Sequence, residues 1–531
     1  MVQVTDNTAQ VTPRGKRRVL VACLGAMGVI LASDYLIARV IFLSMADLTP
    51  VNLIAAILLL LAELFMALHG VEYLFSVIRF MPDSSPPKAD MGDWTNAPEV
   101  VLMVPARHEP YDVLNTTLSF LENIDYPNKQ IYLLDDSSDP QYKQEAAKLA
   151  ARHGVNLFCR TDHRGAKAGI VNDCMATVDA RYFAVFDADQ NPMPGFLKAI
   201  IPLLEANPRL AFVQTPQFYT NTETNPIAAA SHMQNCIFYE YVCEGKNAKG
   251  AMICCGTNMV IRTEAFRQVN GFDERSVTED FSTTIDLHIA GWSSLYYPHV
   301  SVYGAGPEQL GEYLKQQWRW ARGNIGVSKK VWKLLLTKPR ALSFWQWWEH
   351  LITGSYFLIG WAYFILMICP ILYVCFDIPP FFMNPYIYGL TFVPYFTMSF
   401  MLFIITMSRR RYSRRQISFG IQLSFISIPI YMAAAVSALL GRKSRFRVTG
   451  KAGGGVTAYR NLWPELLLWL INYIALIWGI NRFLFERNFS LGINLVWITY
   501  HFILLSSIFY FRVPQRNTKE SDIASKPSVA G

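Results

Sequence analysis

Acidic residues recur directly after short apolar runs in the middle of the chain. Asp135 and Asp136 follow one such run, and Asp187 and Asp189 follow another. Two carboxylates at the end of a strand can hold a hard divalent cation, which commonly takes substrate phosphates as its remaining ligands. Because turns are also rich in aspartate, each pair taken alone fits an ordinary loop equally well.

Two further segments carry groups that suit transfer chemistry. Lys167 lies among glycines in "HRGAKAG" (163–169), where a cation could stabilise negative charge on a leaving group. In "SVTEDFSTTIDLHIAGW", we expect Thr278 to cap a helix whose first turn carries Glu279 and Asp280. These acids complement the helix dipole, and a carboxylate there could also act as a general base. A basic turn and a plain capping arrangement are the alternative explanations.

The segment "LKQQWRWARG" (314–323) places three unlike side chains on one helix face. Gln316, Arg319 and Trp320 lie at positions i, i+3 and i+4 of the expected helix. An interfacial helix with an aromatic belt accounts for Trp318, but it does not account for Gln316 and Arg319. The face therefore suits neither a dry core nor a solvated surface.

The acidic residues need a scaffold, and the surrounding pattern predicts one. The segments 99–110, 130–139 and 181–192 each begin as an apolar run and end in polar residues, with helical stretches such as 141–153 between them. This alternation predicts an α/β fold with a largely parallel sheet, whose ligand site lies at the carboxyl ends of the strands. The segment "CCGTN" (254–258) fits a tight turn after a further apolar strand.

Composition predicts membrane helices on both sides of this α/β domain. Of 531 residues, 52% are hydrophobic and 17% are charged, and the mean hydropathy is +0.20, which is too apolar for a soluble protein. Runs long enough to span a bilayer cover residues 19–43, 51–80, 351–375, 386–407, 462–480 and 491–511. The basic "GKRR" before the first run places the N-terminus, and hence the α/β domain, in the cytoplasm. A cleaved signal peptide is the competing interpretation, but the first run is too long for one.

Residues 417–440 admit two interpretations. Basic clusters flank this segment, so a crossing would place one cluster outside, against the positive-inside bias. We therefore expect an interfacial helix and six spans, with seven spans as the alternative. The predicted N-terminal half has a cytoplasmic segment (1–18), two spans (19–81) and the cytoplasmic α/β domain with interfacial helices (82–340). Two further spans (341–407), the interfacial helix (408–440), a loop (441–456), the last two spans (457–511) and a disordered tail (512–531) follow.

Charge and cysteine content narrow the partners. The net charge of +8 comes largely from the juxtamembrane clusters, which suit anionic lipid head groups of the bilayer. The soluble part carries no nucleic-acid recognition module, so no nucleic-acid partner is expected. The nine cysteines show no metal-ligand spacing, and a cytoplasmic location favours reduced thiols.

Together these motifs resemble those of processive family-2 glycosyltransferases, specifically the cellulose synthase-like group related to hyaluronan and chitin synthases. The motifs that carry the resemblance are, in order, Asp135–Asp136, "FDAD", "TED" and Gln316-x-x-Arg319-Trp320. Each is common, but four in this order between membrane spans are specific. In addition, "FRVTGK" (446–451) is similar to the gating loop of these enzymes, so the likeness runs from about residue 82 through the last spans.

The resemblance implies a GT-A (Rossmann-like) cytoplasmic domain inserted in an α-helical multi-pass domain of the plasma (inner) membrane. It further implies a UDP-sugar donor, Mg2+ or Mn2+ as cofactor, and an inverting UDP-forming hexosyltransferase. Such an enzyme elongates a β-linked polysaccharide, here most directly a β-glucan, and translocates it. The growing chain is then the acceptor, and an accessory export partner is left open.

The resemblance also implies a role for each motif residue. The donor would bind to Asp135, Asp136, Lys167, Asp187, Gln316 and Arg319, with Phe446, Val448, Thr449 and Lys451 closing over it. Asp187 and Asp189 would hold the cation. Asp280 would deprotonate the acceptor hydroxyl, with Glu279 and Arg319 completing the catalytic set. Trp320, Cys255 and Gly256 would hold the terminal acceptor sugar.

Two departures and three alternatives accompany this resemblance. Gln190 stands where a histidine is common in the family, which leaves the third protein contact of the metal open. Gln317 stands second in the Gln-x-x-Arg-Trp motif, where the cellulose enzymes typically have arginine, and this weakens the assignment to cellulose itself. The alternatives are a hyaluronan- or chitin-like synthase that uses an N-acetylated sugar, a non-processive transferase to a lipid acceptor, and a sugar-binding channel with an inactive domain. Retention of Asp187, Asp189, Asp280 and Arg319 argues against the last.

Overall fold

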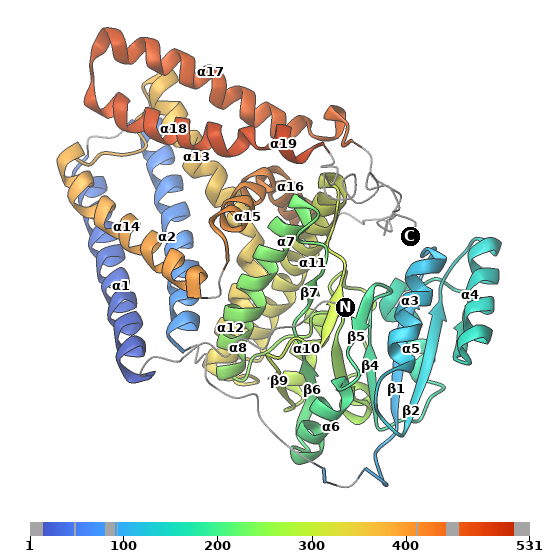
Figure 1. The fold of residues 1–531 in the computed structure, drawn as a ribbon. Coiled ribbons are helices and arrows are strands. Elements are labelled where there is room, and N and C mark those ends of the chain that lie inside the picture. Colours follow the sequence, from blue (N-terminus) through green and yellow to red (C-terminus); the bar gives the residue numbers. More distant parts are fainter. Residues whose placement is uncertain are drawn as a thin grey trace, which may run out of the picture.

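The computed structural model describes residues 14–46, 49–79, 91–92, 94–409, 412–441 and 456–513. An α/β unit lies on one side of the molecule and long apolar helices lie on the other (Figure 1). The helices α7 (Pro226–Ile237), α11 (Leu310–Thr337) and α12 (Phe344–Ser355) lie between the two parts. Residues 1–13, 47–48, 80–90, 93, 410–411, 442–455 and 514–531 lie outside this description.

The α/β unit is built on a seven-stranded sheet with the order β3-β2-β1-β4-β8-β6-β9. The strands are β1 (Val100–Ala106), β2 (Lys129–Asp135), β3 (Asn156–Cys159), β4 (Tyr182–Val185), β6 (Leu210–Gln214), β8 (Met259–Arg262) and β9 (Ser293–Tyr296). β1 pairs in parallel with β2 and β4, β2 with β3, and β6 with β9, whereas β8 runs antiparallel to β4 and β6. The predicted, largely parallel sheet is therefore confirmed.

Helices cover both faces of this sheet, which explains why its strands are continuously apolar. One core joins β1 and β4 to α3 (Tyr111–Glu122), α4 (Pro140–His153) and α6 (Phe196–Ala206). The other core joins the opposite strand face to α5 (Ala166–Met175), α8 (Cys243–Ala248), α9 (Thr263–Gln268) and α10 (Glu279–Ile289). Because both faces are filled, polar side chains gather at the strand ends.

A second, three-stranded sheet continues from the end of β4. It consists of β5 (Gln190–Pro192), β10 (Val302–Gly304) and β7 (Phe218–Tyr219) in the order β5-β10-β7. Gly304 pairs with Gln190 on one side and with Tyr219 on the other. This row places Tyr219 two strands away from the turn that carries Asp189.

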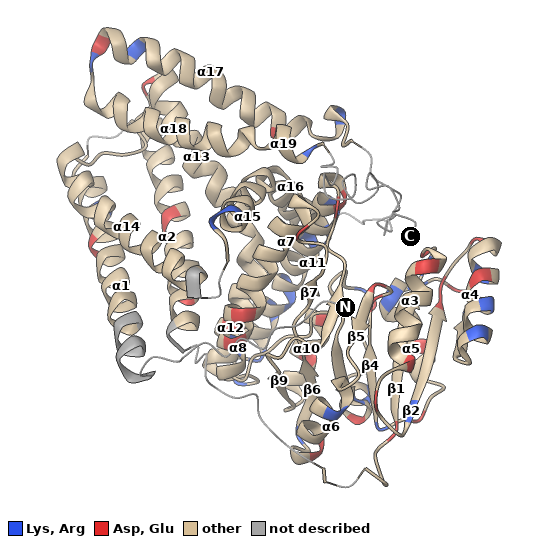
Figure 2. Cartoon of the chain, in the orientation of Figure 1, with Lys and Arg blue, Asp and Glu red and all other residues tan. Residues whose placement is uncertain are grey.

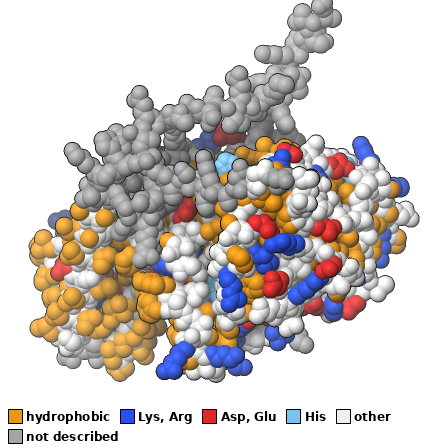
Figure 3. Space-filling model, turned by 90° about the horizontal axis from the view of Figure 1, so that it is seen from below, with side chains coloured by type: hydrophobic (Ala, Val, Ile, Leu, Met, Phe, Trp, Pro, Cys, Tyr) orange, Lys and Arg blue, Asp and Glu red, His pale blue; other side chains and the backbone are white. Residues whose placement is uncertain are grey.

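Six helical segments of the described chain are long and apolar enough to cross a membrane, as predicted. They are α1 (Arg14–Met45), α2 (Pro50–Arg79), α12 with α13 (Ile359–Phe376), α14 (Pro385–Arg409), α17 (Trp463–Glu486), and α18 (Phe489–Ser506) with α19 (Ile508–Phe511). Charged residues are sparse on these helices and frequent on the α/β unit (Figure 2). From below, hydrophobic side chains gather on the side of α1 and α2 (Figure 3), as expected of a surface that faces lipid.

The segment predicted to lie at the membrane interface is a bent pair of helices. α15 (Arg414–Ile426) and α16 (Ile428–Leu439) meet at 45°. Gln234 of α7 donates to the hydroxyl of Ser424 at 2.9 Å, and the hydroxyl of Tyr431 donates to Gln317 of α11 at 2.9 Å. The pair thus packs on helices of the intermediate layer, and its interfacial position, with a seventh span as the alternative, stays a prediction.

Candidate active site

The first acidic strand end keeps one carboxylate oxygen without a partner. Asp135 ends β2 and is buried. One of its oxygens accepts a hydrogen bond from the Ser137 amide at 3.1 Å, while the other is buried with no hydrogen-bond partner among the described residues. An orphaned buried oxygen costs about 1–3 kcal/mol unless a ligand donates to it. Asp135 is therefore available to a ligand at the carboxyl end of the sheet.

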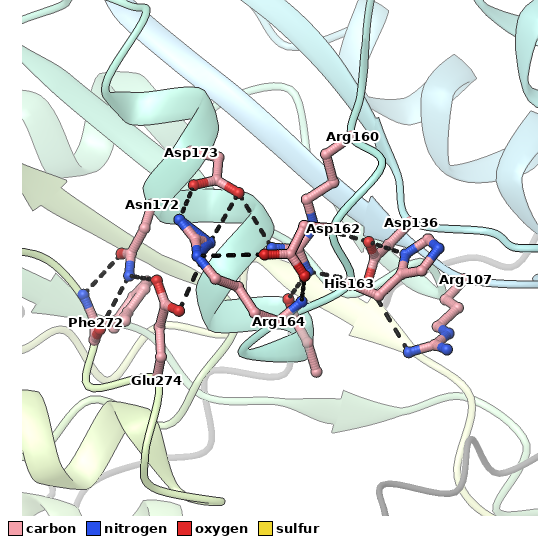
Figure 4. A network of polar contacts seen from close by, with 11 residues as sticks. Arg107, Asp136, Arg160, Asp162, His163, Arg164, Asn172, Asp173, Phe272 and Glu274 are labelled. Carbon is pink, nitrogen blue, oxygen red and sulfur yellow. Dashed lines mark hydrogen bonds and ion pairs between the residues drawn. The ribbon is translucent and has the colours of Figure 1, made fainter.

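Both carboxylate oxygens of its neighbour Asp136 already have partners within the protein (Figure 4). Arg160 donates to both of its oxygens, at 2.8 and 3.1 Å, and His163 Nδ1 lies 2.8 Å from one of them. Burial alone would raise the pKa of Asp136, but these hydrogen bonds outweigh burial and hold the pKa below its usual value. Arg160 also donates to Asp173 at 3.2 Å. The network organises the loop between β3 and α5 and thus the start of α5, where Lys167 lies.

Lys167 joins two segments that lie far apart in the sequence. Its ammonium donates to the Asp187 carboxylate and, at 2.7 Å, to the Gly256 carbonyl. Burial alone would lower the pKa of Lys167, but the nearby Asp187 and Glu279 carboxylates outweigh burial and raise it. The Asp187 side chain is 45% exposed, so it keeps a surface for another ligand.

Gly256 also lies next to Asp280, which with Glu279 begins α10. It has φ +82°, and a Cβ at this position would lie 3.0 Å from Asp280 Oδ2, so only glycine fits without strain. Desolvation raises the pKa of Asp280 to about 6 and that of Glu279 to about 7, and the charge of Asp280 adds to the second shift. A carboxylate whose pKa lies near neutrality is suited to general-base catalysis.

The structure corrects the expected role of Thr278. It precedes α10, but its side chain makes no capping hydrogen bond, and its hydroxyl is buried without a partner among the described residues. The reason is a close approach of α11, because a Cβ at Gly323 would lie 2.4 Å from the Thr278 methyl group. Lys330 of α11 also donates to Asp286 of α10 at 2.6 Å. These contacts hold α11 against α10, the helix that carries Glu279 and Asp280.

The predicted helix over residues 314–323 is confirmed, since it lies wholly within α11. Gln316 has a buried side-chain oxygen with no hydrogen-bond partner among the described residues, whereas Gln317 is held by Tyr431 of α16. Trp320 packs beside the buried cluster around Ala321 and Tyr431. The side-chain oxygens of these adjacent glutamines therefore differ: that of Gln317 accepts a hydrogen bond, whereas that of Gln316 has no partner among the described residues.

Comparison with known proteins indicates which kind of reaction this site could catalyse. A model of the family described as glycosyl transferase family group 2 matches residues 182–408, a range that includes Asp187, Asp280 and α11. Cellulose synthase 2 of Novacetimonas hansenii is 26% identical over 86% of this chain and 29% of its own length. The UDP-forming cellulose synthase catalytic subunit of Pseudomonas fluorescens SBW25 is 26% identical over 79% of this chain and 57% of its own length. These matches support a cellulose synthase-like family-2 glycosyltransferase.

The glycosyltransferase spans less than two thirds of the length of these relatives. Among solved structures, a mannosyltransferase from Pyrobaculum calidifontis in complex with GDP-mannose and Mn2+ aligns with a TM-score of 0.49 at 16% identity. The alignment covers 79% of this chain and all of the mannosyltransferase. That likeness is too loose to support a conclusion about ligands.

The acids after β4 suit a divalent cation that arrives with the substrate. The described part of the glycosyltransferase contains no group of three or more His, Cys, Asp or Glu residues that could hold a metal ion. Two carboxylates, Asp187 and Asp189, fit a cation that takes its other ligands from a diphosphate. Gln190 does not supply the third contact, because its oxygen accepts from Asn258 at 3.0 Å.

Sequence reasoning missed the residues that hold the "CCGTN" turn in place. Gln214 accepts from the Cys255 amide at 2.8 Å and donates to the Thr257 carbonyl at 2.8 Å. The Thr257 hydroxyl accepts from the Asp187 amide at 2.9 Å. Gln214 ends the apolar run "LAFVQ", the same pattern that drew attention to the other strand ends, so the signal was present. The loop residues Phe446, Val448, Thr449 and Lys451 lie outside the described residues.

Proposed function

We propose that this glycosyltransferase elongates a β-linked polysaccharide, most directly a β-glucan, from a UDP-sugar and passes it across the plasma (inner) membrane. One observation carries the proposal. Lys167 contacts both Asp187 and the Gly256 carbonyl, and Gly256 lies against Asp280. Groups suited to a nucleotide diphosphate and a group suited to an acceptor hydroxyl thus lie next to one another.

In the proposed reaction, the donor binds along the carboxyl ends of the sheet. The free oxygen of Asp135 accepts a hydrogen bond from the nucleoside, while Asp136 shapes the adjoining loop. Asp187 and Asp189 would hold Mg2+ or Mn2+ together with the diphosphate, and the cation would supply positive charge to the departing UDP. Lys167 and Arg319 supply further positive charge, and removal of one such contact typically costs about 3–4 kcal/mol of barrier.

The acceptor hydroxyl is activated on the other side of the pocket. Asp280 takes its proton, the hydroxyl oxygen attacks the anomeric carbon in line with the leaving UDP, and the configuration inverts. Burial and the charge of Asp187 keep the pKa of Asp280 high, and the charge of Asp280 adds to the raised pKa of Glu279. Cys255 and Gly256, with Trp320 on α11, hold the terminal sugar of the chain, and the loop with Phe446, Val448, Thr449 and Lys451 closes over the donor.

A cavity among the membrane helices supports the translocation step. It has a volume of about 650 Å³ and lies between α1, α2, α13, α14 and α18. Its wall is rich in aromatic side chains, among them Tyr388 and Trp497, which are joined by a 3.2 Å hydrogen bond. Aromatic faces with polar edges suit the alternating apolar faces and hydroxyls of a sugar chain.

The test is a reconstitution with purified protein in detergent. Several UDP-sugars are offered with Mg2+ or Mn2+, release of UDP is followed, and any high-molecular-weight product is digested with linkage-specific glucanases. We expect one UDP-sugar to yield polymer that a β-glucanase degrades. Absence of UDP release with every donor would favour a sugar-binding channel, and transfer of a single sugar to a lipid would favour the non-processive alternative.

A further inference from the structure

Asn172 links α5 to a turn that lies 100 residues further along the chain. Its side-chain nitrogen donates to the Phe272 carbonyl at 3.0 Å and to the Glu274 carboxylate at 2.9 Å. Its side-chain oxygen accepts from the Phe272 amide at 2.9 Å. One side chain thus binds both backbone groups of Phe272 and holds the turn formed by residues 271–274 against α5 (Figure 4).

The same turn also contacts the start of α5. Gly165 directly precedes α5 with φ +62°, and a Cβ at this position would lie 2.8 Å from Glu274 Cγ. Likewise, Gly271 has φ +82°, and a Cβ there would lie 2.5 Å from Asn172 Oδ1. Only glycine permits both the backbone conformation and the close approach. Lys167 is the second residue of α5 and lies between these two contacts, so the turn fixes the part of α5 that carries its ammonium.

On its other side, the turn is bonded to α10. The Asp273 amide donates to the Thr283 hydroxyl at 3.1 Å, and Asp273 Oδ2 accepts from the Ser282 hydroxyl at 2.8 Å. Ser282 and Thr283 are buried and lie within one helical turn of Asp280. Hydrogen bonds therefore join the helix that carries Lys167, through this turn, to the helix that carries Asp280.

We propose that Asn172 is a positioning residue that sets the place of Lys167 relative to Asp280. This inference rests on the proposed function, in which Lys167 faces the leaving diphosphate and Asp280 faces the attacking hydroxyl. An in-line displacement needs both groups in register, and a misplacement of about 1 Å can cost about 100-fold in rate. Asn172 acts through the turn 271–274 and not by contact with the substrate.

The first variant is Asn172→Ala, assayed by initial rates of UDP release from the UDP-sugar that supports polymer formation. We expect kcat to fall about 10- to 100-fold, because the two groups lose their register. The KM for the donor should change less than about threefold, since the loss appears in the transition state.

Glu274 provides a milder second variant on the other side of the same hydrogen bond. Glu274→Ala removes one of the three hydrogen bonds of Asn172, so kcat should fall about 3- to 10-fold. Glu274→Gln keeps an oxygen that accepts from Asn172 and should restore kcat to within about twofold of the wild type. Equal rates in Glu274→Ala and Glu274→Gln would contradict the proposed role of this hydrogen bond.

Asn221→Ala is the matched control, because Asn221 makes the same pattern of hydrogen bonds in another loop. It donates to the Gly306 carbonyl at 2.9 Å and to Glu308 at 3.1 Å, and it accepts from the Gly306 amide at 2.8 Å. Asn172→Ala and Asn221→Ala should therefore lower Tm by similar amounts. Only Asn172→Ala should lower kcat by 10-fold or more, and equal losses of kcat in both would assign Asn172 a merely structural role.

A double-mutant cycle decides whether Asn172 acts through Lys167. In the Lys167→Met background no ammonium remains to be placed, so Asn172→Ala should lower kcat further by less than about threefold. The same loss in both backgrounds, or a wild-type kcat in Asn172→Ala, would overturn the inference while polymer synthesis stands. Release of UDP from none of the donors by the wild type would remove the proposed function itself.

Discussion

Two acidic clusters at the carboxyl ends of the sheet differ in how well their charges are balanced. Around Asp136, Arg160 and His163 satisfy both carboxylate oxygens. Around Lys167, by contrast, a single ammonium faces Asp187, Glu279 and Asp280. The pKa of Asp136 is lowered, whereas those of Glu279 and Asp280 are raised. The first cluster therefore stabilises a loop, and the excess acid of the second suits proton transfer and cation binding.

The largest effect should come from Asp280→Asn. The amide cannot accept the acceptor proton, so we expect polymer formation to fall by about 1000-fold or more, in the upper part of the range typical of a general base. UDP-sugar binding should survive, because Asp135, Lys167 and Asp187 are unchanged. UDP release measures the first quantity and calorimetric titration of UDP-sugar the second. Near-normal turnover would show that the two clusters do not differ in the way proposed.

Lys167→Met should lower kcat about 100- to 1000-fold, because it removes a positive charge that faces the leaving diphosphate. Lys198→Met is the matched control, since Lys198 on α6 also pairs with an aspartate, Asp125, at 2.6 Å, but its side chain is 38% exposed and its partner is not a site residue. Initial rates at saturating donor compare the two variants. Similar rates in both would contradict a role for Lys167 in the reaction.

Arg160→Met should act on stability. Its side chain and that of Asp136 are each 6% exposed, and loss of Arg160 leaves the buried Asp136 charge only partly compensated by His163, which costs up to about 3–5 kcal/mol. Arg164→Gln, which removes an ion pair whose arginine is 49% exposed, should cost less than about 1 kcal/mol. Thermal unfolding in detergent separates them. A Tm for Arg160→Met equal to that of the wild type would mean that this cluster does not support the fold.

The smallest effect concerns pH. The general base must be deprotonated, and its pKa is raised, so kcat/KM of the wild type should fall on the acid side near pH 6–7, above the range of an ordinary aspartate. Asp187→Asn removes a like charge that contributes to the raised pKa of Asp280, so this limb should move to lower pH in the remaining activity. A pH–rate profile measures the shift. An unmoved limb would mean that Asp187 does not influence the titration of the general base.

The sequence alone determined those features that depend on local order. Apolar runs that end in acids predicted β1, β2 and β4 and the edge at which their acids lie, because parallel strands present their carboxyl ends together. Spacing put Gln316, Arg319 and Trp320 on one helix face, and long apolar runs marked the six segments able to cross a membrane. These features need only neighbours in the chain.

Tertiary structure decided which of these polar groups have hydrogen-bond partners within the protein and which keep an atom for a ligand. Nothing local separates Asp135 from Asp136 or Gln316 from Gln317, yet in each pair one is paired by a distant residue, Arg160 or Tyr431. Thr278 has the sequence of a helix cap, but the approach of α11 prevents it. The reason is physical. A hydrogen bond or a pKa depends on every group within a few ångströms, and those groups come together only when the chain folds.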